Sequence, residues 1–369
     1  MTPSRLVSLD ILRALAIFLV LGRHFVLGSD ITDKWYGTLL VVWRRGGWAG
    51  VDLFFVLSGF LVSGLLFREY LQYRSISITR FYVRRGLRIY PPFYFFLLIC
   101  LFWKWSFTGE LSAKSVLIEV FFLQSYLRGV WSHTWSLAVE EHFYILLPVL
   151  LWMLSRRQRS SNDVFHALPK VTVALGIGLL VIRTINGLTR PYSHQTHTFP
   201  THLRLDALMI GVLLSYFYNF RRKSFLSACA PYRYFLLVLG ITAYTLPFML
   251  KLGTNLFMHT IGFTLLSLGG AALLTGLLLS ELPNSRLVSI LAFIGSCSYS
   301  IYLWHIPVQE LIVPLSQWSI GIHFPDLARN LSYFFGSLLL GVALSKTLDF
   351  PVLAMRDRLF PSRSMLSPT

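Results

Sequence analysis

Ten apolar runs, each long enough to cross a bilayer, constrain this chain of 369 residues more than any other feature. The hydrocarbon core of a membrane is about 30 Å thick, and a helix needs about 20 mainly apolar residues to span it. Only 13% of the residues are charged, and the mean hydropathy is +0.61. We therefore predict an all-α, polytopic membrane helix bundle of about ten transmembrane helices, at residues 8–27, 48–67, 89–107, 136–154, 169–187, 204–219, 233–251, 258–280, 288–313 and 329–347.

The basic residues predict an orientation for this bundle. The segment between the second and third spans carries six arginines against one glutamate, Glu69. Short cytoplasmic loops are enriched in Lys and Arg, so this segment is predicted to be cytoplasmic and both termini fall on the same side. Residues 112–127 are apolar enough for a short span, but counting them would place Arg156 and Arg157 outside. We interpret 112–127 as an interfacial or re-entrant helix on the external side.

The net charge of +17 does not indicate nucleic-acid binding. The Lys and Arg residues fall between apolar runs and do not line one soluble surface. Cys100, Cys229 and Cys297 are scattered without a Cys-x-x-Cys spacing, so neither a disulfide framework nor a metal site is indicated. We see no internal repeat. Residues 1–369 are expected to form a single integral membrane domain with no appended soluble domain.

Arg13 and His24 lie within the first apolar run. Eleven helical steps of about 100° make about three turns plus roughly 20°, so the two side chains share a face about 16 Å apart. Ionisable groups at membrane depth are costly, and an aligned pair therefore indicates a polar pathway or site inside the bundle. By the predicted topology, Arg13 lies toward the cytoplasm and His24 toward the outside.

Carboxylates open the second and fourth spans. Asp52 is predicted at the depth of His24, where it could orient the imidazole and raise its basicity. Glu140 and Glu141 are about 100° apart on a helix, so one of them is expected to point into a site. Gly59 is the first of two small residues spaced four apart in the second span, which favours close approach of another helix.

The sixth and ninth spans add further ionisable groups. Arg204 opens the sixth span, and His305 follows Tyr302 by three residues in the ninth. A lone histidine at membrane depth more often packs than catalyses, and both interpretations stay open for His305. A site is favoured because one topology places five ionisable residues in the external halves of their spans: His24, Asp52, Glu140, Arg204 and His305.

Arg85 and Arg88 lie at the cytoplasmic mouth of the third span. They are three residues apart on one helix face and could bind a single phosphate group. Basic residues there also serve topology and lipid headgroups. A cytoplasmic donor with phosphates could bind Arg85, Arg88 and Arg13 while a thin arm reaches His24, and coenzyme A has that shape. His24 would then be the general base for an external hydroxyl, with direct attack or a transient acyl-imidazole.

These segments resemble the acyltransferase-3 family of integral membrane acyltransferases over essentially the whole chain. Six motifs carry the resemblance: Arg13-x10-His24, the run 50–60, Arg85-x-x-Arg88-Ile89-x-Pro91, the run 135–144, Arg204-Leu205-Asp206 and the run 298–305. There are two mild departures. His142 stands where the family usually has Gln, and Asp349-Phe350-Pro351 replaces a Glu-x-Pro.

The resemblance implies a membrane O-acyltransferase of a bacterial cell (inner) membrane. The acyl group, acetyl in most relatives, would pass from cytoplasmic acyl-CoA to a hydroxyl of a cell-envelope, exopolysaccharide or secreted oligosaccharide acceptor, without a metal. The expected partners are acyl-CoA, a saccharide or glycolipid acceptor and the lipid bilayer. The expected site comprises catalytic His24, Glu140 and Asp52, donor-binding Arg13, Arg85 and Arg88, and substrate-binding Glu141, Arg204, Tyr302 and His305.

Two other classes of protein fit parts of the pattern. A multi-pass transporter or flippase of a saccharide or lipid-linked intermediate also has polar groups inside a helix bundle, but it typically shows inverted repeats and broken helices in matching halves. In a lipid-binding scaffold, Arg13 and His24 would cost free energy on insertion into the membrane, and no function would offset that cost. The loop 188–203, with three histidines, is either a sugar platform or an incidental polar loop.

Overall fold

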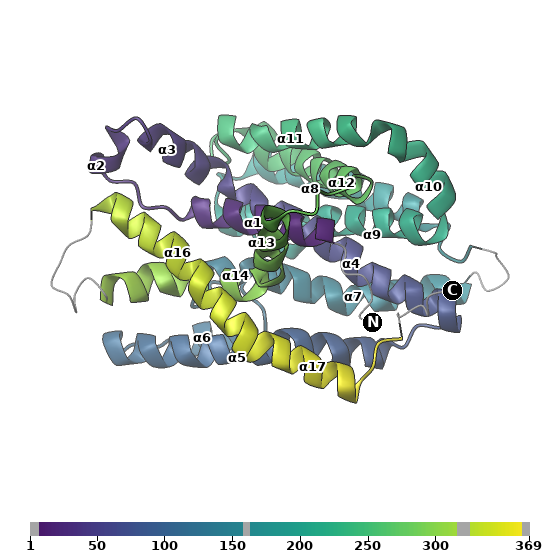
Figure 1. Ribbon diagram of the computed structural model, residues 1–369, viewed down its shortest axis with the longest axis horizontal. Helices are drawn as coiled ribbons and strands as arrows, with labels where there is room; N and C mark the ends of the chain where they lie inside the picture. The colour runs from purple at the N-terminus through teal and green to yellow at the C-terminus, as the bar shows by residue number, and fades with distance from the viewer. Residues whose placement is uncertain (1–6, 158–162, 316–324, 364–369) are drawn as a thin grey trace.

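The computed structural model describes residues 7–157, 163–315 and 325–363, and every regular element within them is a helix. The predicted all-α class is thus confirmed. Figure 1 shows most helices running along the long axis of the molecule, with α16 crossing one face obliquely. The longer helices are α1 (Val7–Arg23), α3 (Gly37–Gly46), α4 (Gly50–Tyr73), α5 (Ile78–Thr108), α7 (Trp135–Arg157), α8 (Leu168–Thr189), α9 (Leu205–Phe220), α11 (Arg233–Met249), α12 (Phe263–Leu278), α13 (Arg286–Ser296), α14 (Ser298–Pro307), α16 (Asp326–Leu344) and α17 (Phe350–Leu359). The shorter ones include α2 (Ser29–Thr32), η1 (Gly47–Ala49), α6 (Ala113–Val120), η2 (Ser132–Thr134), η3 (His194–Thr198), α10 (Arg222–Cys229) and η7 (Val308–Ile312).

The helices long and apolar enough to cross a membrane number seven among the described residues, or eight if a bent pair counts as one span. The expected count of about ten is therefore not confirmed. Each of the ten predicted runs does contain a helix, but α9 has only 16 residues. It packs among other helices of the bundle. A helix surrounded by protein does not have to match the bilayer thickness, so this length is compatible with a place inside the bundle.

The ninth predicted span, 288–313, is not a single straight helix. It divides into α13 and a following segment that begins with α14, and the two are bent by 66°. Beside the bend, Gly295 lies against the backbone of α1, where an added Cβ would come 1.7 Å from the carbonyl oxygen of Asp10. This contact positions α14, which carries Tyr302 and His305, at the centre of the bundle.

The interior and the outside of the bundle differ in their side chains. Helices α1 and α4 bury most of their residues. In contrast, α8, α11 and α16 expose large apolar side chains such as Ile177, Val238 and Leu339. A continuous exposed apolar surface of this kind is expected where helices contact lipid. The site residues described below come mainly from the interior helices.

The most extensive helix contact lies between α4 and α9, and it is also a close one. A Cβ added at Gly59 would be 1.9 Å from the carbonyl oxygen of Leu208, and one added at Gly211 would be 2.2 Å from that of Val56. The close approach predicted at Gly59 is therefore confirmed. This crossing brings Arg204, at the start of α9, next to Asp52 in the first turn of α4.

The stretch 112–127 holds only the eight-residue helix α6 followed by turns. A helix of that length rises about 12 Å and cannot cross a bilayer. Its buried carboxylate, Glu119, accepts hydrogen bonds from the Trp131 amide (2.9 Å) and the Thr134 hydroxyl (2.9 Å). These bonds hold the segment against the start of α7.

Candidate active site

Two cavities lie inside the bundle and share a wall. The first has a volume of about 280 Å³, and we call it the basic cavity; its polar lining includes Arg13, Arg85, Arg88, Glu140 and Glu141. The second, the histidine cavity, has a volume of about 240 Å³, and its lining includes His24, His133, His305, Trp135 and Arg204. Val51 and Tyr302 line both cavities. Sequence positions far apart are thus gathered into two adjoining compartments.

Both adjacent glutamates line the basic cavity, whereas only one was expected to point into a site. Glu140 accepts hydrogen bonds from Ser58 of α4 (2.6 Å) and from Tyr144 (2.7 Å). Glu141 accepts one from Tyr90 of α5 (3.2 Å). The cavity lies between α4, α5 and α7, so each carboxylate meets a different neighbouring helix. Glu140 therefore shares a compartment with the arginines and not with His24.

The three predicted donor-binding arginines also meet in the basic cavity. Arg13 comes from α1 and pairs with Asp10 at 3.2 Å. Arg85 lies over the ring of Tyr144, with its guanidinium carbon 3.8 Å from the ring centre. Arg88 lies one helical turn further along α5. Three cations from two helices therefore face one space, as the sequence predicted.

A smaller chamber of about 70 Å³, which we call the vestibule, adjoins the basic cavity and shares Arg85 and Arg88 with it. Its lining adds four more arginines: Arg80, Arg84, Arg356 and Arg363. Arg80 and Arg84 donate to the backbone carbonyls of Pro361 and Phe360, beyond the end of α17. Arg356 was not predicted as a site residue, because basic residues after a last span are common topology signals.

Asp52 does not contact His24. Its Oδ1 accepts a hydrogen bond from Arg204 Nη2 at 2.6 Å, and its Oδ2 has no hydrogen-bond partner. Both side chains are almost completely buried, at 1% and 2% exposure. A buried carboxylate is costly unless a cation compensates it, and Arg204 is the cation that α9 brings beside it. The expectation that Asp52 orients the imidazole of His24 is therefore corrected.

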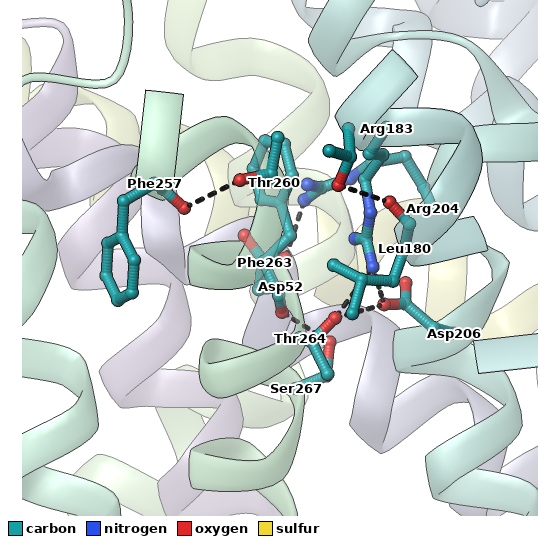
Figure 2. Close-up of polar contacts among 11 residues, drawn as sticks. Asp52, Leu180, Arg183, Arg204, Asp206, Phe257, Thr260, Phe263, Thr264 and Ser267 are labelled. Atoms are coloured by element: carbon teal, nitrogen blue, oxygen red, sulfur yellow. Dashed lines mark hydrogen bonds and ion pairs between the residues drawn. The ribbon is translucent and has the colours of Figure 1, made fainter. Parts of the chain in front are cut away.

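A second buried ion pair adjoins the first (Figure 2). Arg183 of α8 donates to Asp206 Oδ2 and to the Thr264 hydroxyl, both at 2.7 Å. The Arg204 guanidinium carbon also lies 3.8 Å from the centre of the Phe263 ring. Arg183 was not predicted as a buried charge, although an arginine within the apolar run 169–187 was the available signal.

Three histidines surround one part of the histidine cavity. The His24 ring lies 5.0 Å from the His305 ring, and His133 also lies 5.0 Å from His305, measured between ring centres. The backbone carbonyl of His24 accepts a hydrogen bond from Gln309. His133, in the turn before α7, was not predicted as a site residue. Its only signal was a histidine immediately before the fourth apolar run.

Tyr302 forms much of the wall between the two cavities. Its hydroxyl donates to the carbonyl of His133 at 2.7 Å and lies 2.5 Å from the hydroxyl of Ser136. The ring contacts His305 and Phe54, with centres 5.5 and 6.3 Å away. The side chain is thus fixed from α7 while it separates the arginines from the histidines.

The three histidines of the loop 188–203 have different surroundings. His194 lines the histidine cavity and stacks on Phe199, which in turn stacks on Trp135 with centres 4.8 Å apart. Burial lowers the pKa of His194, so its ring is neutral at pH 7. His197 packs against His259, and His202 stacks on Tyr126. Only His194 of the three lines either of the two main cavities.

The described residues contain no group of three or more His, Cys, Asp or Glu side chains arranged to hold a metal ion. The polar side chains that line the two cavities carry imidazole, carboxylate, guanidinium and hydroxyl groups. One cavity thus combines imidazoles with an aromatic wall, and the adjoining cavity holds a cluster of cations.

Comparison with known proteins identifies the family. The acyltransferase domain of the acyltransferase-3 family matches residues 6–346. The O-acetyltransferase OatA of Staphylococcus aureus strains NCTC 8325 and COL is 27% identical over 367 residues, which covers 90% of this chain and 57% of that protein. SACOL0978 of S. aureus strain COL, whose name gives O-acetyltransferase activity provisionally, is 27% identical over 368 residues, covering 89% of this chain and 56% of that protein. The chain spans little more than half the length of these relatives.

No solved structure matches the chain. The domain match nevertheless extends from the start of α1 into the last span, and it includes all the residues that line the basic and histidine cavities. The chain belongs to the acyltransferase-3 family.

Proposed function

We propose that this chain is a bacterial membrane O-acyltransferase that moves an acetyl group from acetyl-CoA to a hydroxyl of a saccharide or glycolipid acceptor. One observation carries the proposal: the basic cavity and the histidine cavity share a wall at Val51 and Tyr302. A phosphate-bearing donor and a hydroxyl-bearing acceptor can therefore occupy separate compartments and meet at this wall. The relatives named O-acetyltransferase support acetyl as the transferred group.

The donor binds from the basic end of the bundle, where the connection between α4 and α5 meets the end of α17. Phosphate groups of coenzyme A bind Arg85, Arg88 and Arg13, with Arg356 of the vestibule contributing further positive charge. We place this end in the cytoplasm because Lys and Arg are concentrated there. The pantetheine arm extends through the basic cavity toward Tyr302.

Glu140 and Glu141 serve the donor in this proposal. Glu141 was predicted to bind substrate. It lines the same cavity as the arginines, and its Oε1 is buried without a hydrogen-bond partner. An unpaired buried carboxylate oxygen is a strong acceptor for an N–H group. Glu141 therefore accepts a hydrogen bond from an amide of the pantetheine arm. Glu140, held by Ser58 and Tyr144, lies beside the path of the thioester.

The acceptor occupies the histidine cavity. The stacked rings of Trp135, Phe199 and His194 give this cavity an aromatic wall suited to the apolar faces of sugar rings. Arg204 also lines it, and its Nη1 and Nε are buried without hydrogen-bond partners. These N–H groups donate to sugar oxygens. Asp52 contributes by holding Arg204 in place.

The transfer itself requires a base at the shared wall. His24 accepts the proton of the acceptor hydroxyl, and the oxygen forms a bond to the carbonyl carbon of the thioester. The carbon–sulfur bond breaks, and the coenzyme A thiolate leaves and takes the proton from His24. The histidine ends the cycle neutral, so one residue serves as base and then as acid. Tyr302 lines the path of the acetyl group between the cavities.

The test uses purified full-length protein in lipid nanodiscs with radiolabelled acetyl-CoA and a soluble oligosaccharide or envelope-glycan acceptor. We expect H24A to lose about 10²- to 10⁴-fold in transfer rate, the usual contribution of a general base. H166A is the matched control, because His166 is an exposed loop histidine that lines neither cavity. Transfer by H24A within about tenfold of the wild-type rate would remove His24 from the mechanism.

A further inference from the structure

A general base works best when one ring nitrogen is fixed and the other is free, and His24 needs a partner for this purpose. Asp52, the carboxylate expected to orient it, is bound to Arg204. Within the described residues, no hydrogen bond holds either ring nitrogen of His24; the contact to Gln309 involves only its backbone carbonyl. The group that orients His24 must therefore come from another residue that lines the same cavity.

His305 has a nitrogen suited to this purpose. Its Nδ1 lies 2.6 Å from the carbonyl oxygen of Tyr302. A carbonyl oxygen can only accept, so Nδ1 must carry the hydrogen and Nε2 must carry the lone pair. Nε2 is buried and has no hydrogen-bond partner. The side chain is completely buried, so this acceptor is kept from solvent in a polar cavity.

His133 shows the same arrangement with the nitrogens exchanged. Its Nε2 lies 3.1 Å from the carbonyl oxygen of Leu303 and must donate, which leaves Nδ1 as an unpartnered buried acceptor. Nδ1 of His133 and Nε2 of His305 both lack a hydrogen, so they cannot hydrogen-bond to each other. Each of these nitrogens therefore needs an N–H or O–H from a third group. Among the three adjacent imidazoles, only His24 has an N–H that no carbonyl holds.

We propose that His305 is the positioning residue of His24: its Nε2 accepts a hydrogen bond from one ring N–H of His24 and leaves the other nitrogen free to deprotonate the acceptor. The two rings are 5.0 Å apart and inclined by 60°, which allows facing nitrogens to reach hydrogen-bonding distance. The backbone carbonyl of Tyr302 fixes the tautomer of His305, and His305 fixes that of His24. This inference rests on the proposed function, since it assigns a partner to the proposed base.

The test compares three substitutions at one position. Gln places an amide oxygen near the position of Nε2, Asn places an amide near that of Nδ1 and does not reach Nε2, and Ala removes both contacts. We expect the kcat of H305N and H305A to fall about 10- to 100-fold while the KM for acetyl-CoA stays unchanged. H305Q should recover at least tenfold of that loss. Recovery of kcat by Gln but not by Asn separates positioning from a general packing defect.

The melting temperature of each purified variant is measured together with its transfer rate. If H305N does not fold, the comparison of H305Q with H305A provides the same test. Equal kcat values for H305Q, H305N and H305A would overturn the inference, as would wild-type kcat in H305A. H24A is measured in parallel. If H24A is inactive while H305A is fully active, the inference fails and the proposed function stands. If H24A keeps transfer within about tenfold of the wild-type rate, His24 is not the base and the inference fails with it. If the wild-type protein transfers no acetyl group, the proposed function itself fails.

Discussion

At the scale of single residues, the buried charges of the bundle depend on partners from other helices, as Asp52 of α4 depends on Arg204 at the start of α9. Arg13, Arg85 and Arg88 could be predicted as one cluster because their spacing and topology are local properties of two helices. The pairing of Asp52 with Arg204 could not, because it depends on how α4 and α9 cross, 152 residues apart in the chain. The assignment of a carboxylate to His24 failed for this reason: the partner of Asp52 depends on which helix packs beside α4.

The arginines of the basic cavity should control affinity for the donor. A charge-assisted hydrogen bond to phosphate contributes about 1.5–3 kcal/mol, so R85A and R88A should each raise the KM for acetyl-CoA about tenfold to hundredfold. The effect on kcat should be smaller, because neither residue lies in the histidine cavity. Steady-state kinetics with radiolabelled acetyl-CoA measures both parameters. R157A, an exposed arginine at the end of α7, is the control. An unchanged KM in R85A and R88A would leave them only a role in topology.

The ion pair between Asp52 and Arg204 should contribute mainly to the stability of the fold. Removing one partner of a buried pair leaves an uncompensated charge and typically costs about 3–5 kcal/mol, whereas replacing both by apolar residues is often neutral. We expect D52L to lower the melting temperature of the purified protein strongly, and the double variant D52L with R204M to recover most of the loss. A D52L protein that keeps wild-type stability and loses only kcat would contradict this interpretation.

At the scale of helices, hydrophobic runs predicted where elements occur but not how they bend. All ten runs contain helices, and α6 is too short to cross, in line with the treatment of 112–127 as a non-crossing segment. The 66° bend between α13 and α14 was not predicted. Hydropathy continues across the bend, whereas its position depends on the contact between Gly295 and the backbone of α1. The bend matters because α14 carries Tyr302 and His305.

The crossing of α4 and α9 should tolerate no side chain at Gly59. An added Cβ would lie 1.9 Å from a backbone oxygen of Leu208, which cannot move as a flexible side chain would. We expect G59A to destabilise the protein by about 1–3 kcal/mol through overpacking. G176A on α8 is the matched control, because nothing lies within 4 Å of its added Cβ. That change should be neutral or stabilising by up to about 1 kcal/mol. Thermal unfolding that showed the two variants to be equally stable would mean that the helices separate more easily than this packing indicates.

At the scale of the whole molecule, the two cavities are the feature that local patterns could not predict. The basic cavity is lined by α1, α4, α5, α7 and α14, and the histidine cavity by many of the same helices toward the opposite end. Their shared wall combines Val51 of α4 with Tyr302 of α14, which follows the 66° bend. Charge distribution along the sequence did predict that arginines gather at one end, since each short basic loop contributes to it independently.

The orientation of the molecule is open to a direct test. Arg157 ends α7 at the basic end, whereas Trp35, 83% exposed, lies between α2 and α3 at the opposite end (Figure 1). A C229S background removes the partly accessible cysteine and leaves Cys100 and Cys297, which are buried, so each site can then carry the single accessible cysteine of the described residues. A membrane-impermeant maleimide should label W35C in intact cells, because that end is predicted to be external, and should label R157C only after permeabilisation. Labelling of R157C in intact cells would reverse the bundle and place the arginines outside, where no cytoplasmic acetyl-CoA could reach them.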